Sequence, residues 1–180
     1  MPTITIEQIT VPYEKELLLK WRDRDTKVVP SFMLDCDGPG IVKGYGFGEW
    51  VAEKYFRDRG NYVFTDFDIL SKSSKYTRYN NMIKTLISQE QENKFKEALE
   101  EALRKGYKIE NPDLFVYNLD TCFFIEAKKG RDKLREPQIR FFYLAKKYLG
   151  IDSKIVYLCH ESSEISSQEL IFEFDFELEV

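Results

Sequence analysis

Hydrophobic residues recur along this chain in two patterns, short runs of strand length and stripes at helical spacing. The runs predict strands at residues 3–6, 62–69, 114–117, 122–128 and 154–159, and alternation of apolar with acidic residues predicts another at 170–180. The stripes predict helices at residues 12–21, 48–59, 80–105 (in two pieces) and 135–149. Because helices and strands intermix along one chain, we expect an α/β (α+β) fold.

The predicted hairpin at residues 114–128 carries the most informative chemistry. Successive side chains of a strand alternate across the sheet, so Phe124, Glu126 and Lys128 share one face. If the two strands pair, Asp113 comes close to the same end. Two carboxylates and a lysine that converge at a sheet edge can hold a hard divalent cation and position a water. The alternative is a surface ion pair between Glu126 and Lys128, worth ~0–1 kcal/mol.

The helix predicted at residues 48–59 adds a third acid. Glu49 lies in its first turn and on the same side as Ala52 and Phe56, which is unusual for a solvated carboxylate. The alternative is a capping role, since an acid in the first turn interacts well with the helix dipole. The glycine-rich segment at residues 43–48 before it lacks the spacing of a dinucleotide fingerprint, and we expect a flexible entry to the helix.

Composition indicates one domain and argues against several kinds of site. The 180 residues are 43% hydrophobic and 15% aromatic, so we expect residues 1–180 to form a single domain with a sheet-rich core. Three cysteines without CxxC spacing argue against a disulfide framework or a thiolate zinc site. His160 is the only histidine, which argues against His-rich metal centres and Ser-His-Asp hydrolysis. A P-loop sequence is absent, which argues against an ATPase.

The N-terminal residues lack the pattern of a secretory signal, and no apolar run approaches the ~20 residues of a membrane span. We therefore expect a cytoplasmic protein, intracellular and not secreted, with no membrane partner.

Charge is distributed unevenly around the modest net value of −4. Residues 161–180 contain seven acids and no Lys or Arg, whereas the segment after Glu126 is basic. Basic side chains with a tyrosine also occur in the predicted loop at residues 70–78. Such segments suit contact with nucleic-acid phosphates and bases, although a solvated surface is the alternative. The candidate DNA-contacting residues are Lys129, Arg131, Lys133, Arg135 and Arg140, with Lys72, Lys75 and Arg78 from the loop.

Three short motifs in this order, Pro112-Asp113, Glu126-Ala127-Lys128 and Gln138, resemble the PD-(D/E)XK nuclease superfamily and, within it, the VRR-NUC (virus-type replication-repair nuclease) family. The resemblance covers roughly residues 48–159. It implies a restriction-endonuclease-like αβββαβ core with a mixed central sheet flanked by helices, at about residues 44–160. Residues 1–43 would be an N-terminal extension, 70–108 a helical insert and 161–180 an acidic C-terminal strand.

The resemblance also implies a role for each residue of the site. Asp113 and Glu126 would bind the metal together with the carbonyl of Ala127, and Lys128 would orient or deprotonate the attacking water. Glu49, with Glu53 as the alternative, would be the helix acid and a further metal ligand. Gln138 would steady the site from the following helix. The implied cofactor is Mg²⁺, with Mn²⁺ as a substitute.

These features give two hypotheses of different classes. The first is a metal-dependent deoxyribonuclease, a structure-selective endonuclease or nickase acting on branched or flapped DNA in phage or bacterial replication, repair or recombination. A homodimer would let one site cut each strand of a symmetric branch. The second is a nuclease-like fold without catalysis that binds DNA or a protein. The converging carboxylates and lysine favour the first.

Overall fold

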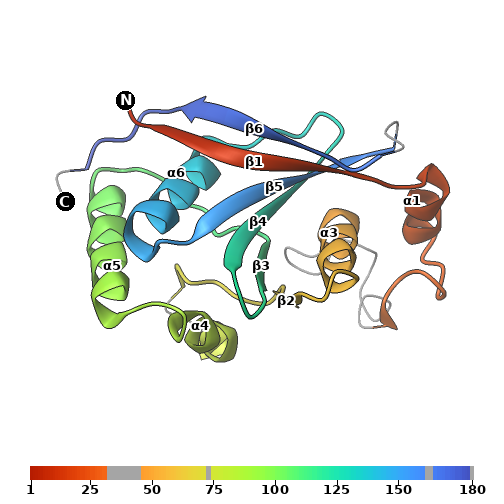
Figure 1. Ribbon diagram of the computed structural model, residues 1–180, viewed down its shortest axis with the longest axis horizontal. Coiled ribbons are helices and arrows are strands. Elements are labelled where there is room, and N and C mark those ends of the chain that lie inside the picture. Colours follow the sequence, from red (N-terminus) through yellow and green to blue (C-terminus); the bar gives the residue numbers. More distant parts are fainter. Residues whose placement is uncertain (32–45, 72–73, 161–163, 179–180) are drawn as a thin grey trace.

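A mixed six-stranded sheet forms the centre of the molecule (Figure 1). The structure is a computed structural model and describes residues 1–31, 46–71, 74–160 and 164–178. The strand order is β2-β3-β4-β5-β1-β6. The strands are β1 (Thr3–Pro12), β2 (Tyr62–Phe64), β3 (Leu114–Tyr117), β4 (Cys122–Lys129), β5 (Asp152–Cys159) and β6 (Ser166–Glu173).

Both strand directions occur in this sheet. Strands β2, β3 and β4 are antiparallel neighbours, β4, β5 and β1 are parallel, and β6 is antiparallel to β1. The long antiparallel pairing of β1 with β6 forms one side of the sheet and the short β2 forms the other (Figure 1).

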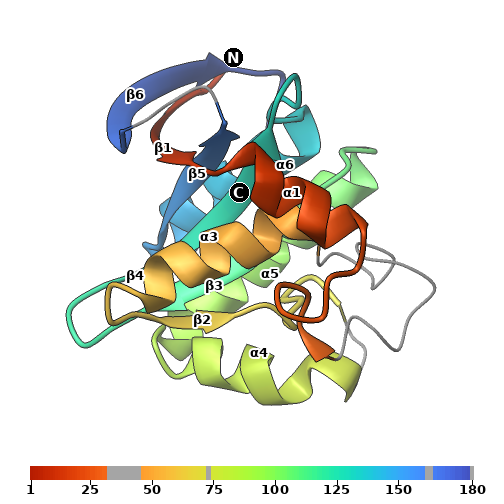
Figure 2. The same cartoon turned by 90° about the vertical axis from the view of Figure 1, so that its right-hand side faces the viewer.

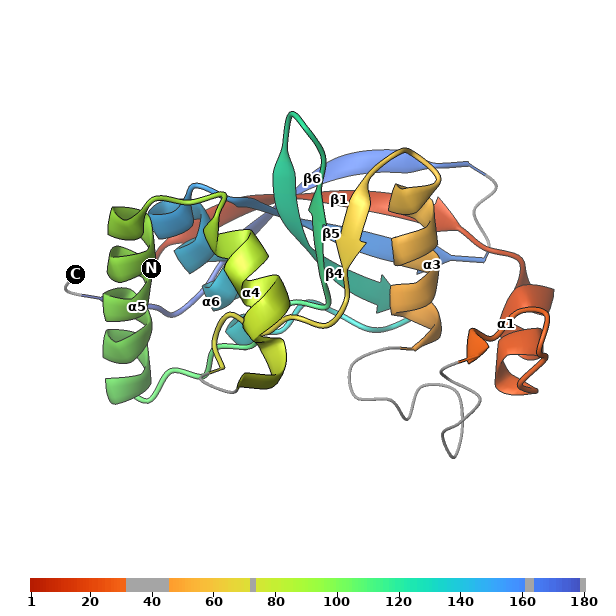
Figure 3. The same cartoon turned by 90° about the horizontal axis from the view of Figure 1, so that it is seen from below.

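Helices cover both faces of the sheet (Figures 2 and 3). Helices α1 (Lys15–Arg22) and α3 (Phe47–Arg57) lie on one face. The other face carries α4 (Thr77–Lys84), α5 (Gln89–Arg104) and α6 (Glu136–Leu144), which continues into the π-helical turn η2 (Ala145–Leu149). The short 3₁₀ turn η1 (Ser74–Tyr76) precedes α4. The mixed α/β class predicted from the sequence is confirmed.

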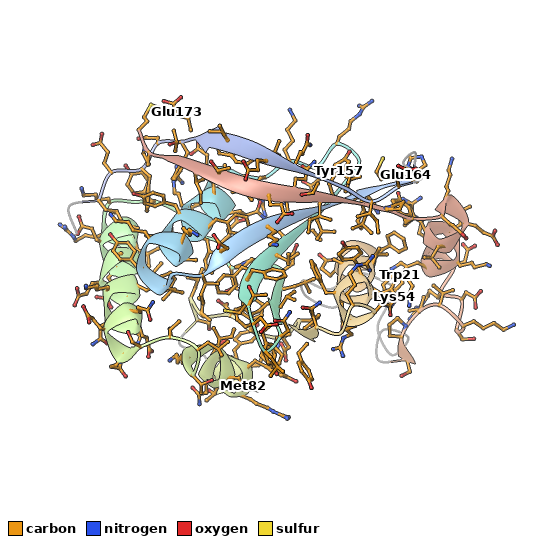
Figure 4. The ribbon with its side chains drawn as sticks, viewed as in Figure 1. Trp21, Lys54, Met82, Tyr157, Glu164 and Glu173 are labelled. Atoms are coloured by element: carbon orange, nitrogen blue, oxygen red, sulfur yellow. The ribbon has the colours of Figure 1, made fainter. Side chains whose placement is uncertain are left out.

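Strand alternation divides the apolar residues between two cores. Phe123 and Ile125 of β4 point to the side of α1 and α3, and Phe124 points to the side of α5 and α6. Trp21 of α1 reaches α3, where its ring lies 5.9 Å from Phe47 (Figure 4). Glu126 and Lys128 follow Phe124 by two and four positions and therefore lie on the α6 face.

Two predicted strands are shortened or displaced in the structure. The strand at residues 62–69 ends at Phe64, because the backbone of residues 67–69 is bound by side-chain amides instead of a neighbouring strand. Asn80 donates to the Asp68 carbonyl at 2.7 Å and accepts from the Asp68 amide at 3.0 Å. Asn111 does the same for the Phe67 carbonyl and the Ile69 amide, at 3.1 and 3.2 Å.

The acidic C-terminal strand is displaced relative to the prediction. Pairing with β1 covers Ser166–Glu173, and the chain then leaves the sheet. Phe174 and Phe176 are 2% and 4% exposed, with their rings against Tyr143 of α6. Apolar and acidic residues alternate both in β6 and in residues 174–178, because one side of each segment packs against the protein. Only β6 is a strand.

The helical insert contains the two predicted helices, but its first helix begins before the predicted residue 80. Helix α4 starts at Thr77, so Arg78 lies in a helix and not in a loop. Ser88 caps α5 by accepting from the Gln91 amide at 3.1 Å. Within the described parts of the chain, no helix has the length and apolar character needed to cross a membrane.

Candidate active site

The β3–β4 hairpin brings Asp113 and Glu126 together. Leu114 pairs with Ile125, so Asp113, one residue before the ladder, lies opposite Glu126 on the same face. The Asp113 carboxylate is fixed there because its Oδ2 accepts a hydrogen bond of 2.8 Å from the Ala127 amide. The predicted pairing of the two strands is therefore confirmed, and it places both acids at one end of the hairpin.

Glu126 is a buried carboxylate with an unequal environment for its two oxygens. Its residue is 3% exposed. Oε1 accepts from the Lys128 ammonium at 2.9 Å and from the Gln138 side-chain amide. Oε2 is buried and has no hydrogen-bond partner among the described residues. Buried polar atoms are nearly always paired, so this oxygen requires an explanation.

Lys128 is buried as well, at 5% exposure. Its Nζ lies 2.9 Å from Glu126 and 3.7 Å from Asp132, whose side chain is largely exposed. The ion pair with Glu126 considered from the sequence therefore exists, but it is inside the protein and not on an exposed edge. The sequence gave no local signal that Asp132 lies near Lys128, because an acid in a basic loop is common on protein surfaces.

Gln138 holds Glu126 from the first turn of α6. The side-chain carbonyl of Gln138 accepts from the Arg135 amide at 3.0 Å, which caps the helix, and the amide nitrogen donates to Glu126. Pro137 stands at the start of the helix, and its carbonyl accepts from the Glu110 amide at 3.2 Å. The buried partner expected for this glutamine is thus the strand that carries Glu126.

Glu49 approaches the site from α3. Its Oε2 accepts from the Gly46 amide at 2.8 Å, so the capping role considered from the sequence is real. Its charge also raises the pKa of Asp113 and of Glu126, which places it near both carboxylates. Glu53, the alternative helix acid, binds Arg57 at 2.6 Å on the same helix. Because the charge of Glu49 acts on Asp113 and Glu126, we expect Glu49, and not Glu53, to be the third acid beside the hairpin.

Burial and like charge dominate the electrostatics of the cluster. Burial raises the pKa of Asp113 well above its usual range, and the charges of Glu126 and Glu49 raise it further. Burial also raises the pKa of Glu126, against the opposing effect of Lys128. Lys128 opposes this rise at both Asp113 and Glu126, Arg135 opposes it at Glu126, and Glu49 acts on Lys129. The pKa values of Asp113 and Glu126 remain raised, so these cations do not fully offset burial and like charge.

A hard divalent cation fits this donor set. The unpartnered Oε2 of Glu126, the Asp113 carboxylate and the Ala127 carbonyl are oxygen donors of the kind that Mg²⁺ prefers, and Mg²⁺ keeps several waters in such sites. Across the residues that the structure describes, no three Asp, Glu, His or Cys side chains form a ready-made metal cage. A cation would therefore rely on two carboxylates, a peptide carbonyl and water.

The basic residues after β4 differ in their surroundings. Arg131 and Lys133 are exposed in the loop that follows the strand. Arg135 is 62% exposed, although it binds Glu110 at 2.7 Å. Lys129 packs with its ammonium 5.2 Å from the Phe47 ring, and burial, followed by the nearby Arg22, lowers its pKa.

Arg140 is a correction to the predicted DNA-contacting set. It is 8% exposed, its guanidinium binds Glu136, and it donates to the Asp175 carbonyl at 3.2 Å. Its role is to join α6 to the C-terminal segment, so it is removed from that set.

The basic side chains of the insert lie on η1 and α4. Lys75 and Arg78 are exposed there, and their charged groups lie 5.0 Å from the Tyr76 ring and 5.6 Å from the Tyr79 ring, respectively. Lys72 and residues 43–45 of the glycine-rich segment fall outside the described residues.

Asn111 is the residue of this region that sequence reasoning missed. Its side chain joins the backbone of residues 67–69 to the start of β3, immediately before Asp113. The available signal was its position before Pro112, where an amide side chain often fixes a turn.

Comparisons with known proteins give no family for this chain. No protein-family model matches the sequence, no curated protein matches it, and no solved structure matches the fold.

Proposed function

We propose that this protein is a Mg²⁺-dependent nuclease that hydrolyses phosphodiester bonds of DNA. The observation that carries the proposal is the buried, unpartnered Oε2 of Glu126, which lies beside Asp113 and two residues from the buried Lys128. An uncompensated buried carboxylate oxygen costs stability, and a bound cation removes that cost.

The order of elements supports the same proposal. From residue 47 to residue 159 the chain runs α3, β2, β3, β4, α6, β5, with α4 and α5 inserted between β2 and β3. This is the αβββαβ order of the restriction-endonuclease-like core that the sequence motifs resemble. Strands β2 to β5 are also consecutive neighbours in the sheet, which brings the motifs to one place.

Each residue has a distinct part in the proposed reaction. Asp113, Glu126 and the Ala127 carbonyl would hold the cation, and Glu49 would add negative charge from α3. Lys128 holds or deprotonates the attacking water beside Glu126. Gln138 keeps the Glu126 carboxylate in place through its amide. The bound Mg²⁺ supplies charge that stabilises the phosphoryl oxygens as negative charge develops on them.

Arg131, Lys133 and Arg135 provide the electrostatic contact with the DNA backbone. These three residues follow β4 directly along the chain. A phosphate bound near Lys128, at the end of β4, therefore lies close to their side chains. A structure-selective endonuclease or a nickase in DNA replication, repair or recombination is the activity consistent with this arrangement.

Metal-dependent cleavage tests the proposal. The purified full chain should nick supercoiled plasmid or cut fork, flap or four-way-junction DNA with Mg²⁺ or Mn²⁺, and not with EDTA. Glu126→Gln and Lys128→Ala should abolish the cleavage. Lys154→Ala is the matched control, because Lys154 forms a strand ion pair with Glu7 at 2.8 Å away from the cluster. It should cut as the wild type does.

Two outcomes contradict the enzymatic reading. One is cleavage that survives both substitutions, which identifies a contaminating nuclease. The other is the absence of cleavage on every substrate by folded protein. Binding of DNA without cleavage would instead support the alternative, a nuclease-like fold that serves as a binding module.

A further inference from the structure

A cavity of about 420 Å³ lies on the α6 face of the sheet, immediately beside Lys128. Its floor consists of apolar side chains from two strands, Ile155 of β5 with Leu170 and Phe172 of β6. Gln8 of β1 also lines it and offers an amide donor and an amide acceptor. The size is within the range of roughly 300–1,000 Å³ typical of small-ligand sites.

The loop after β4 forms the other wall of the cavity. It contributes the cations of Arg131 and Lys133, and Asp132, which is within 3.7 Å of the Lys128 ammonium. Tyr157, labelled in Figure 4 on β5, fixes this loop by donating from its hydroxyl to the Gly130 carbonyl at 2.6 Å. The cavity therefore combines an apolar, aromatic floor with a positively charged wall.

We propose that this cavity takes one unpaired nucleotide of the DNA strand, next to the phosphate that is cleaved. The position relative to that phosphate rests on the proposed nuclease function, because Lys128 belongs both to the cluster and to the cavity lining. The base lies against the Phe172 and Tyr157 rings and the neighbouring aliphatic side chains. Arg131 and Lys133 bind the phosphates on either side of it.

The chemistry selects an unpaired base and not a paired one. Base–aromatic stacking uses the flat face of a base, and the Gln8 amide can bond its edge. In a duplex the neighbouring bases cover the face of each base and the complementary base occupies its edge. A paired nucleotide therefore enters the cavity only by leaving the stack. The cavity thus gives the proposed enzyme a preference for single-stranded segments, as found at gaps, flaps and branches.

A cavity-filling substitution tests this assignment by binding alone. Leu170→Trp places an indole over the floor, whereas Ile171→Trp is the matched control, because Ile171 is the next residue on the strand and is 75% exposed. Fluorescence anisotropy in EDTA measures affinity for a labelled single-stranded oligonucleotide and for the duplex of the same length. The wild type should prefer the single strand. Leu170→Trp should weaken single-strand binding about tenfold, the loss of one stacked base, with duplex binding unchanged.

Circular dichroism must show that both tryptophan variants are folded. If Leu170→Trp does not fold, Gln8→Leu provides a smaller change in the lining of the same cavity. Single-strand affinity that is equal in wild type, folded Leu170→Trp and Gln8→Leu overturns the assignment. An equal loss in Ile171→Trp overturns it as well.

Cleavage by the same variants separates this inference from the function on which it rests. If the wild type cuts DNA and Leu170→Trp cuts gapped and fully paired substrates in the wild-type ratio, the nuclease proposal stands and the cavity assignment fails. If the wild type cuts nothing but Leu170→Trp loses single-strand binding, the cavity binds a nucleotide and the nuclease proposal fails.

Discussion

Replacing Asp113 by asparagine should stabilise the metal-free protein. Asparagine keeps a side-chain oxygen that can accept the 2.8 Å hydrogen bond from the Ala127 amide, so the hairpin contact survives. It removes a half-buried negative charge on which the charges of Glu126 and Glu49 act. Each pKa unit by which folding raises the pKa of a carboxyl corresponds to about 1.4 kcal/mol, so the gain at neutral pH should be on the order of 1–4 kcal/mol. For a chain of this size each kcal/mol corresponds to roughly 2–4 °C in Tm.

The gain should depend on pH in a defined direction. The pKa of Asp113 is raised in the folded protein above its ordinary value of 3.8, chiefly by burial. The folded state therefore binds this proton more tightly than the unfolded state does. Its contribution to stability is complete below the unfolded pKa and is lost as pH rises through the folded pKa. The Tm of Asp113→Asn should thus match that of wild type near pH 3.5 and exceed it increasingly toward neutral pH.

Thermal unfolding followed by circular dichroism, in EDTA and in Mg²⁺, measures both effects. Mg²⁺ should raise the Tm of wild type at pH 7.5, because a ligand that binds only the folded state stabilises it. It should leave Asp113→Asn nearly unchanged. Asp120→Asn is the control, since Asp120 is exposed at the turn of the same hairpin. A variant that is no more stable than wild type at neutral pH, or that gains equally from Mg²⁺, would refute the reasoning.

Three further predictions test other parts of the structure. Gln138→Ala should lower the free energy of unfolding by about 1–3 kcal/mol in urea denaturation, because it removes a hydrogen bond to the buried Glu126 carboxylate and the cap on the Arg135 amide; an unchanged midpoint would contradict this. Phe174→Ala should cost about 3–5 kcal/mol, against less than about 0.5 kcal/mol for the exposed Glu173→Ala, and equal midpoints would deny the C-terminal segment its place in the core. Arg140→Ala should lower Tm and leave the salt dependence of DNA binding unchanged, whereas Arg131→Ala should reduce the slope by ~1 without changing Tm; the reverse assignment would restore Arg140 to the DNA interface.

The polar end of the hairpin could be predicted from the sequence because its signals are local. Strand alternation alone places Glu126 and Lys128 on one face, and a short turn forces the two strands to pair. The pairing then fixes Asp113 opposite Glu126. The glutamine was also predictable as a partner of this strand, since an amide on an otherwise apolar helix face needs a buried hydrogen bond. The roles of these residues in catalysis remain predictions.

Features that depend on distant segments could not be predicted in the same way. The strand expected at residues 3–6 is β1, which runs from Thr3 to Pro12 because it pairs with β5 on one edge and β6 on the other. Both partners lie near the far end of the chain and leave no mark on the local pattern. The prediction that Arg140 contacts DNA was wrong for the same reason, because its acceptor, the Asp175 carbonyl, lies 35 residues away in the chain.

The arrangement of donors favours the proposed catalytic site over a surface that only binds. One oxygen of each acid is anchored by the protein: Asp113 by the Ala127 amide, Glu49 by the Gly46 amide, and Glu126 by Lys128 and Gln138. For Asp113 and Glu126 the anchor fixes the direction of a carboxylate whose pKa is raised by burial and by neighbouring acids. A module that only binds DNA gains nothing from oriented acids at its binding surface, because they repel phosphates. A nuclease gains a preorganised cation site, in which the orientation is present before the metal and the substrate arrive. The two hypotheses therefore differ in how the stability of the protein responds to Mg²⁺. The catalytic hypothesis requires that Mg²⁺ restores the stability that these acids cost.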